Sequence, residues 1–188
     1  MDHYVDIHLK PSSEISLGHL LETVLPKLHS ILALLRSGRI GSSFPRAGAG
    51  SYGSVVRLHG TRKDICALMS KPWIPQGMAS YAEVSEVTPV PQGVKYRQVR
   101  RVQGMTRSKV RRQRRHLVNL GCSEQEARKK VPDSVVKHFD SPWVRFRSSS
   151  TGRSFSLRVE QGPLMDRPIE GSFNTYGLSS SGATVPWF

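Results

Sequence analysis

Hydrophobic and polar side chains alternate over residues 2–10, where His3, Val5, Ile7 and Leu9 share one face. This period of two predicts a half-buried β-strand. From residue 17 the period changes, and apolar side chains recur every three or four positions to residue 35. That stripe predicts an amphipathic helix. Its members are Leu17, Leu20, Leu21, Val24, Leu28, Ile31, Leu32 and Leu35.

Local signals mark where this helix begins and where it is disturbed. Ser16 stands before the stripe as an N-cap. Pro26 lies inside the stripe, and because proline has no amide hydrogen, we expect it to kink the helix or to split it in two.

The remaining pattern up to residue 93 predicts two strands, a short helix and a last strand. These elements cover residues 39–45, 54–59, 64–70 and 81–87, and the Gly/Ala/Ser-rich residues 47–53 form a hairpin loop. The resulting order β-α-β-β-α-β is that of a ferredoxin-like domain, a scaffold used by many RNA-binding modules. We therefore expect an α+β protein whose first domain, residues 1–93, is ferredoxin-like and similar to RNA-recognition modules.

Pro89, Pro91 and Gly93 interrupt the chain, so we expect a second domain over residues 94–188. Its pattern predicts an extended segment at 96–103, a helix at 106–118 capped by Thr106, and a shorter helix opened by the capping box Ser123-x-x-Glu126. Residues 143–147 and 155–159 predict a hairpin. The apolar end, residues 185–188, is expected to pack against the body of the protein.

The net charge of the chain gives the strongest indication of its binding partner. The chain has 28 Lys and Arg against 14 Asp and Glu, a net charge of +14, which indicates a polyanionic partner. Residues 87–123 contain no acid. On the helix at 106–118, basic residues recur at 107, 111, 114 and 115, and Val110 and Leu117 remain to pack it. We expect a nucleic-acid partner first, and an anionic membrane surface only as a distant second.

Several classes of protein are excluded. No stretch approaches the roughly 20 apolar residues of a membrane-spanning helix, and the N-terminal residues lack the pattern of a secretory signal. The two cysteines, Cys66 and Cys122, cannot build a disulfide framework or a four-cysteine zinc site, so we expect a cytoplasmic protein. Gly48-x-Gly50-x-x-Gly53 resembles a dinucleotide fingerprint but precedes a strand, which indicates a hairpin loop.

His29 is the candidate for acid–base chemistry. It lies opposite the leucine stripe, where an imidazole would face solvent, and most such histidines have no catalytic role. The histidines and carboxylates show no metal-ligand spacing, so an RNA-cleaving protein of this sequence would use the substrate's 2′-hydroxyl. The hydroxyl-rich residues 148–152 are, by themselves, typical of an ordinary polar turn.

Together these segments resemble the CRISPR RNA-processing endoribonucleases of the type I-F systems over essentially the whole chain. The resemblance rests on short segments in a common order: Met1-Asp2-His3-Tyr4, Lys27-Leu28-His29, Arg39-Ile40-Gly41-x-Ser43-Phe44-Pro45, Tyr96-Arg97-Gln98-Val99, Arg101-Val102-Gln103, Ser123-Glu124-x-Glu126-Ala127-Arg128-Lys129, Arg147-Ser148-x-Ser150-Thr151-Gly152, Phe155, Tyr176-Gly177-Leu178-Ser179 and Val185-Pro186-Trp187-Phe188.

The resemblance implies an enzyme that binds the hairpin of a CRISPR repeat transcript. It cuts at the 3′ base of the stem without metal or cofactor, leaves a 2′,3′-cyclic phosphate and keeps its product. It further implies that His29 is the general base, that Ser148 holds the 2′-hydroxyl in line and that Tyr176 orients His29. The residues expected to bind RNA are Arg101 and Gln103 as base readers, Phe155 as a stacking surface, and Arg107, Lys109, Arg111, Arg112, Arg114, Arg115 and Ser150.

Two other classes stay open. The same scaffold could be a non-catalytic RNA-hairpin-binding subunit of a guide-RNA complex. A helix-turn-helix DNA binder built on residues 106–131 is weaker, because it leaves the first domain without a role. We expect a monomer when free, a subunit of a multiprotein RNA-guided complex when bound, and no membrane partner.

Overall fold

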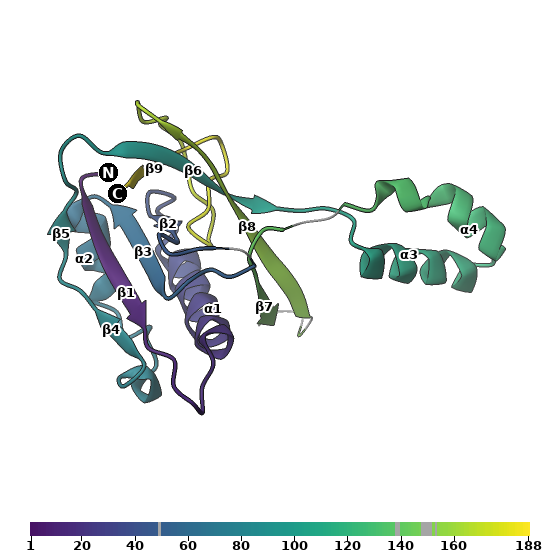
Figure 1. The fold of residues 1–188 in the computed structure, drawn as a ribbon, viewed down its shortest axis with the longest axis horizontal. Helices are drawn as coiled ribbons and strands as arrows, with labels where there is room; N and C mark the ends of the chain where they lie inside the picture. Colours follow the sequence, from purple (N-terminus) through teal and green to yellow (C-terminus); the bar gives the residue numbers. More distant parts are fainter. Residues whose placement is uncertain (49, 138–139, 148–151, 153) are drawn as a thin grey trace. The chain divides into compact units, whose positions relative to one another are not determined.

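Residues 3–84 form the order β-α-β-β-α-β that the hydrophobic pattern predicts, and a short further strand, β5, follows at Thr88–Pro89 (Figure 1). The computed structural model describes residues 1–48, 50–137, 140–147, 152 and 154–188. It contains helices and antiparallel strand pairs in two sheets, so the predicted α+β class is confirmed.

The first sheet has the strand order β2-β3-β1-β4, and β5 also pairs with β1. Neighbouring strands run antiparallel, with Val5 opposite Leu58 and Ile7 opposite both Val56 and Val84. Helices α1 and α2 both contact β1. The bounds are β1 His3–Leu9, α1 Leu17–Leu35, β2 Gly41–Ser43, β3 Val55–Gly60, α2 Arg62–Met69, β4 Ala82–Val84 and β5 Thr88–Pro89, with a 3₁₀ turn at Gln76–Met78.

Helix α1 begins where the sequence predicts, with the Ser16 hydroxyl accepting a hydrogen bond from the amide of His19. It continues through Pro26 to Leu35 as one helix, so of the two expected effects the split does not occur, and the kink stays a prediction. The reason is packing, since Val24 and Leu28, on either side of the proline, are both buried in the same core. Burial of these side chains outweighs the single backbone hydrogen bond that proline removes.

The second sheet has the order β7-β8-β6-β9. The predicted hairpin is confirmed, with Phe146 opposite Phe155, and its second strand is longer than predicted. The predicted packing of the chain's end is also confirmed, because Val185 is fully buried in β9, opposite Arg97 on β6. The bounds are β6 Lys95–Val102, β7 Trp143–Arg147, β8 Ser154–Met165 and β9 Val185–Trp187.

An arginine fastens the last residue to the first sheet. Arg57 on β3 donates to both carboxylate oxygens of Asp6, at 2.7 and 2.8 Å, and to the main-chain oxygen of Phe188 at 3.0 Å. Its guanidinium carbon also lies 4.0 Å from the centre of the Phe188 ring. Planar guanidinium groups suit this combination of a paired carboxylate and a stacked ring.

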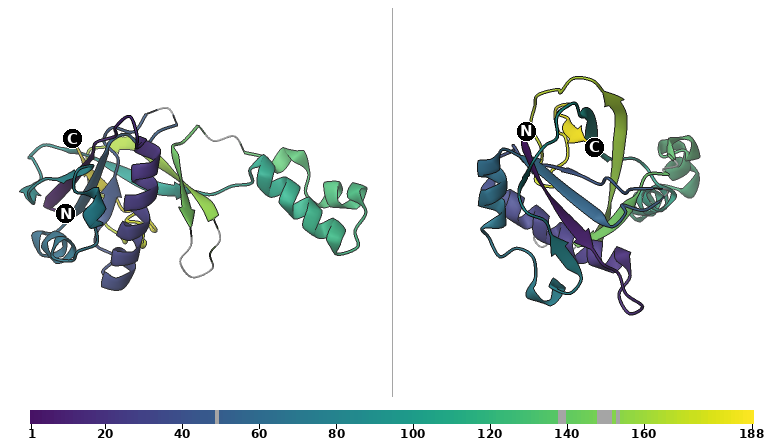
Figure 2. Two further views of the ribbon diagram at one scale, coloured as in Figure 1. Left: turned by 90° about the horizontal axis from the view of Figure 1, so that it is seen from below. Right: turned by 60° about the vertical axis from the view of Figure 1, so that its left-hand side comes forward.

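Two compact units result: residues 1–101 with 141–188, and residues 102–140. The second unit holds α3 Arg107–Asn119, α4 Glu124–Lys130 and a 3₁₀ turn at Asp133–Val135, and α3 and α4 lie side by side in Figure 2. The Thr106 cap and the capping box of Ser123 and Glu126 are confirmed. The two-domain division at residues 93 and 94 stays a prediction. No described helix is long and apolar enough to cross a membrane.

Candidate functional site

His29 lies at the edge of the buried stripe of α1, four residues after the buried Leu25 and three before the buried Leu32, so the expectation that it lies opposite the stripe and faces solvent is wrong. Its ring is half-buried and stacks on the ring of Tyr176, with centroids 4.1 Å apart and planes inclined by 5°. Its Nδ1 is 3.0 Å from the main-chain oxygen of Thr175. The residues that follow β8 therefore cover this histidine.

The Thr175 carbonyl decides which imidazole nitrogen is available. A carbonyl oxygen only accepts hydrogen bonds, so Nδ1 of a neutral His29 must carry the proton. The lone pair then lies on Nε2, the nitrogen at the other side of the ring. In this tautomer, His29 is arranged to accept a proton through Nε2.

Aromatic rings continue from Tyr176 into the second sheet. The Tyr176 ring meets Phe146 edge-on at 5.5 Å, and Phe146 in turn stacks on Phe155 at 5.5 Å. Both phenylalanines lie on the β7–β8 hairpin, opposite each other across the strand pair. The cluster fixes the position of the Tyr176 ring, and Phe155, only partly buried, keeps part of its surface exposed.

Arg101, at the end of β6, lies against the same rings. Its guanidinium carbon is 5.2 Å from the Phe155 centroid and 5.5 Å from that of Tyr176. Its Nε is buried, and it makes no hydrogen bond to the described residues. By contrast, the neighbouring Arg100 is paired with Glu160 at 3.0 Å. A stacked guanidinium without an acidic partner retains its N–H groups for a ligand that accepts hydrogen bonds.

The structure therefore brings together four of the predicted site residues: His29, Tyr176, Arg101 and Phe155. Gln103 is exposed and belongs to the 102–140 unit. The predictions for Ser148 and Ser150 lie outside the described residues. Within the described part of the chain, no three His, Cys, Asp or Glu side chains gather as a metal site would require.

Most of the predicted basic stripe on α3 is open to solvent. Val110 packs the helix and is buried, as predicted. Lys109 Nζ donates to the main-chain oxygen of Gly104 at 3.0 Å. The other basic residues of α3, apart from Arg114, are exposed and form no ion pair with a described residue. These exposed arginines are Arg107, Arg111, Arg112 and Arg115.

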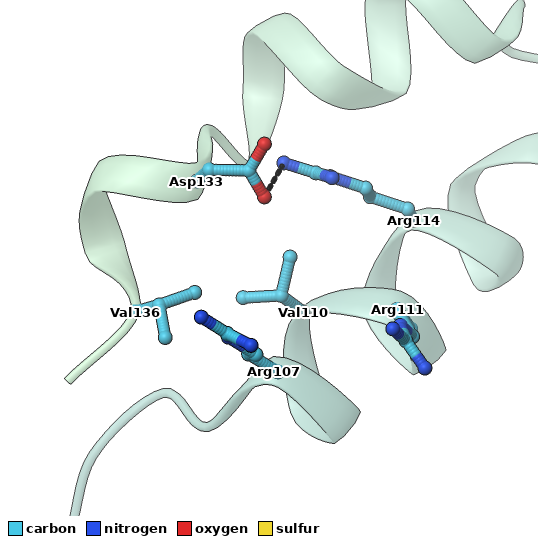
Figure 3. A pocket seen from close by; sticks show the side chains of 6 residues that line it. All are labelled: Arg107, Val110, Arg111, Arg114, Asp133 and Val136. Atoms are coloured by element: carbon cyan, nitrogen blue, oxygen red, sulfur yellow. Dashed lines mark ion pairs between the residues drawn. The ribbon is translucent and has the colours of Figure 1, made fainter. Parts of the chain in front are cut away.

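Arg114 differs from the rest of the stripe. Its Nε donates to the main-chain oxygen of Val131 at 2.8 Å, and its Nη2 lies 3.0 Å from Asp133 Oδ1. Only 19% of its side chain is exposed. Figure 3 shows this ion pair at the side of a cavity of about 430 Å³, with Arg107 and Arg111 also at its wall. Arg114 thus connects α3 to the end of α4.

Sequence reasoning missed three contributors. It did not find the Thr175 carbonyl, because any residue type supplies one, and it did not find Asp133, which lies beyond the acid-free stretch. It also missed Ser42, whose hydroxyl donates to the Tyr176 main-chain oxygen at 3.0 Å. None of these has a pattern that would single it out, because each acts through a contact between distant segments.

Comparison with known proteins gives consistent results. A family model described as CRISPR-associated protein (Cas_Csy4) matches residues 4–188. The chain is 41% identical over 191 residues to the CRISPR-associated endonuclease Cas6/Csy4 of Pseudomonas aeruginosa (strain UCBPP-PA14). It is 35% identical over 189 residues to the protein of the same name from Escherichia coli (strain UTI89 / UPEC). Each alignment covers 100% of both chains.

Proposed function

Because the chain belongs to the Csy4 family of CRISPR-associated proteins, we propose that it is an endoribonuclease that processes CRISPR repeat RNA. It binds the hairpin of the repeat, cleaves at the 3′ base of the stem without a metal ion and keeps the product. The observation that carries this proposal is the His29 imidazole, held through Nδ1 by the Thr175 carbonyl and through its face by Tyr176.

The reaction follows from the free lone pair on Nε2. His29 Nε2 takes the proton of the 2′-hydroxyl, and the 2′-oxygen attacks the adjacent phosphorus. The bond from phosphorus to the 5′-oxygen of the next nucleotide breaks, that oxygen gains a proton from water, and the hydroxide left takes the proton back from His29 Nε2. The products are a 2′,3′-cyclic phosphate and a 5′-hydroxyl. A positioned base contributes about 10²–10⁴-fold to such a step.

Two further residues have proposed roles in this step. Tyr176 orients the imidazole, which its parallel stacking at 4.1 Å supports. Ser148 holds the 2′-hydroxyl in line with the scissile bond, a role that rests on the family resemblance of the segment from Arg147 to Gly152. Alignment of the reacting atoms lowers the entropic part of the barrier.

Recognition of the hairpin divides between base readers and phosphate contacts. Arg101 and Gln103 read base edges at the foot of the stem, since arginine pairs geometrically with guanine and glutamine with adenine. Phe155 stacks under the last base pair, and Ser150 also binds the RNA. The exposed cations of α3 bind phosphates along the stem, where the open end of a short hairpin admits a helix.

We also propose a ferredoxin-like arrangement for the first domain, and a second domain from residue 94 that carries the basic helix. The strand order β2-β3-β1-β4, with antiparallel neighbours and both helices against β1, supports the ferredoxin-like arrangement. In this proposal the protein is a cytoplasmic monomer when free and a subunit of a multiprotein RNA-guided complex when bound to its RNA.

A non-catalytic hairpin-binding subunit is the second candidate, because it would need the same basic helix and base readers. The ordered imidazole favours the enzyme, since mere binding does not require a fixed tautomer. A helix-turn-helix DNA binder would use the 102–140 unit alone, and competition between duplex DNA and the RNA hairpin distinguishes it.

The deciding experiment incubates the protein with its own repeat hairpin in EDTA. We expect a single cut, its loss in His29→Ala with hairpin affinity nearly unchanged, and its loss when the 2′-hydroxyl next to the scissile phosphate is replaced by hydrogen. His19→Ala is the matched control, because His19 is an exposed histidine on the same helix. Normal cutting by His29→Ala, or of the deoxy substrate, would overturn this mechanism.

A further inference from the structure

The residues that hold His29 belong to a short segment, Phe173 to Ser179, here called the 173–179 loop. Both ends are anchored by main-chain hydrogen bonds, from Phe173 to the oxygen of Gly38 at 2.9 Å and from Ser179 to that of Val99 at 2.8 Å. Phe173 and Leu178 are also buried in the core. The loop is thus fixed at its ends, and its apex carries the Thr175 carbonyl and the Tyr176 ring.

The side chain of Asn174 ties the inside of the loop together. Its Oδ1 accepts hydrogen bonds from the amides of Tyr176, at 2.8 Å, and Leu178, at 3.2 Å. Its main chain adds a bond to the Leu178 oxygen at 2.8 Å and one from the Gly177 amide at 2.9 Å. An asparagine that accepts from amides ahead of it in the chain is a known way to fix a tight turn.

Ser42 holds the loop from outside. It is fully buried on β2, where its hydroxyl donates to the oxygen of Tyr176 at 3.0 Å and its amide donates to that of Gly177 at 2.7 Å. Gly177 has φ +71°, and a Cβ there would lie 2.8 Å from the Ser42 hydroxyl. The close approach of the two segments therefore requires glycine at 177.

These contacts leave Thr175 with little freedom. Thr175 is exposed, so its carbonyl is positioned by the residues beside it and not by packing of its own side chain. The same carbonyl is the acceptor for His29 Nδ1. A free imidazole populates both neutral tautomers, and the hydrogen bond made by one nitrogen selects which of them is present.

We propose that Asn174 and Ser42 are positioning residues that act through the 173–179 loop to keep His29 in the tautomer with the proton on Nδ1. The proposal rests on the proposed function, since it assigns them to the same reaction. Neither residue needs to touch the RNA. When either side chain is lost, the Thr175 carbonyl is no longer held in place. A fraction of His29 then adopts the tautomer with the proton on Nε2, and in this tautomer Nε2 cannot act as a base.

The test compares four variants with the wild-type protein. Asn174→Ala removes the acceptor, Asn174→Asp keeps an oxygen in the same place, and Ser42→Ala removes only the hydroxyl. Asn119→Ala is the matched control, because Asn119 is the chain's other asparagine and lies in the 102–140 unit. The first readout is ¹⁵N NMR of histidine-labelled protein without RNA at about pH 8, where a free imidazole is neutral. The His29 signals are identified by their loss in His29→Gln.

We expect one tautomer, protonated at Nδ1, in the wild type, Asn174→Asp and Asn119→Ala, and a mixture in Asn174→Ala and Ser42→Ala. The second readout is single-turnover cleavage of the repeat hairpin, which should slow in proportion to the lost fraction of the competent tautomer, by about 2–10-fold in the two altered variants, with hairpin affinity unchanged, and recover in Asn174→Asp. If Asn174→Ala fails to fold, Ser42→Ala decides.

Unchanged tautomer and cleavage rate in Asn174→Ala and Ser42→Ala would overturn the inference, as would a mixture in Asn174→Asp. Failure of the proposed function is a separate result. In that case the wild type does not cleave the hairpin, while the NMR signals of His29 still respond to Asn174→Ala.

Discussion

Helix α3 contains neighbouring arginines for which we predict different roles, a structural contact for Arg114 and RNA binding for Arg115. Its guanidinium donates to the Val131 oxygen and pairs with Asp133, whereas its neighbour Arg115 is exposed. We therefore predict that Arg114→Ala weakens the attachment of α4 to α3, and that Arg115→Ala weakens RNA binding. The family resemblance alone assigns both residues to the RNA.

The magnitude follows from the contacts. A hydrogen bond from a charged donor contributes about 1.5–3 kcal/mol, and an ion pair with an aspartate as exposed as Asp133, at 84%, adds less than about 1 kcal/mol. We expect Arg114→Ala to lower the local stability of the helix pair by about 1.5–3 kcal/mol. That corresponds to a roughly 10–150-fold larger equilibrium constant for local opening, and to exchange that is faster by the same factor. Asp133→Asn, which keeps the bond to Val131, should lose less than about 1 kcal/mol.

Native-state hydrogen exchange provides the first assay. The Val131 amide donates to the oxygen of Ala127 at 3.0 Å and closes the last turn of α4, so its exchange reports the attachment directly. The second assay is hairpin binding over a salt series. An arginine that neutralises a phosphate releases a counterion, so Arg115→Ala should flatten the slope of log K against log salt by roughly one unit. Arg114, already paired with Asp133, should change this slope much less.

One pattern would refute this reasoning. If Arg114→Ala flattens the salt slope as much as Arg115→Ala and leaves exchange at Val131 unchanged, its guanidinium leaves Asp133 to contact phosphate. The stripe would then be a uniform RNA-binding surface.

Three further predictions concern the 1–101 and 141–188 unit. Arg101→Ala should weaken binding of the matched hairpin by about 1–3 kcal/mol, and a loss that is equal for stems with altered bottom pairs would make Arg101 a backbone contact. Burial lowers the pKa of His59 to about 3, so between about pH 6.5 and 3 the unfolded chain binds a proton that the native state does not. The free energy of unfolding, measured by denaturant titration, should therefore fall by up to about 1.4 kcal/mol for each pH unit. If the free energy of unfolding of His59→Gln falls as steeply with pH as that of the wild type, this prediction is contradicted. Phe188→Ala removes the ring beneath Arg57 and should reduce unfolding free energy by about 1 kcal/mol in denaturant titrations, so an unchanged midpoint would show that the stacked ring contributes nothing.

Local signals account for what the sequence predicts well. The caps at Ser16, Thr106 and Ser123 are each followed by a helix, because a cap and the amide that it accepts are only a few residues apart. The sequence could not decide between a kink and a split at Pro26, since the effect of a proline depends on how deeply its neighbours are buried. Periodicity describes one element at a time, and burial depends on the others.

The candidate site depends still more on distant contacts. Periodicity placed His29 on a solvent-facing surface, and only the family resemblance connected it to Tyr176. The structure adds that the Thr175 main chain, 146 residues away, makes the hydrogen bond. Main-chain groups have no residue signature, so no reading of spacing could identify this acceptor.

The wide separation of His29 from Thr175 has a consequence for protein synthesis. His29, the proposed general base, leaves the ribosome early, but the Thr175 carbonyl that accepts its Nδ1 proton is made 146 residues later. At about 5–20 residues per second, this delay is roughly 7–30 s. During that time the nascent chain can display its basic residues to any RNA nearby without an assembled site to cut it. For the proposed mechanism we therefore expect incomplete chains to bind RNA without cutting it, and cleavage to begin only after the 173–179 loop has folded against α1.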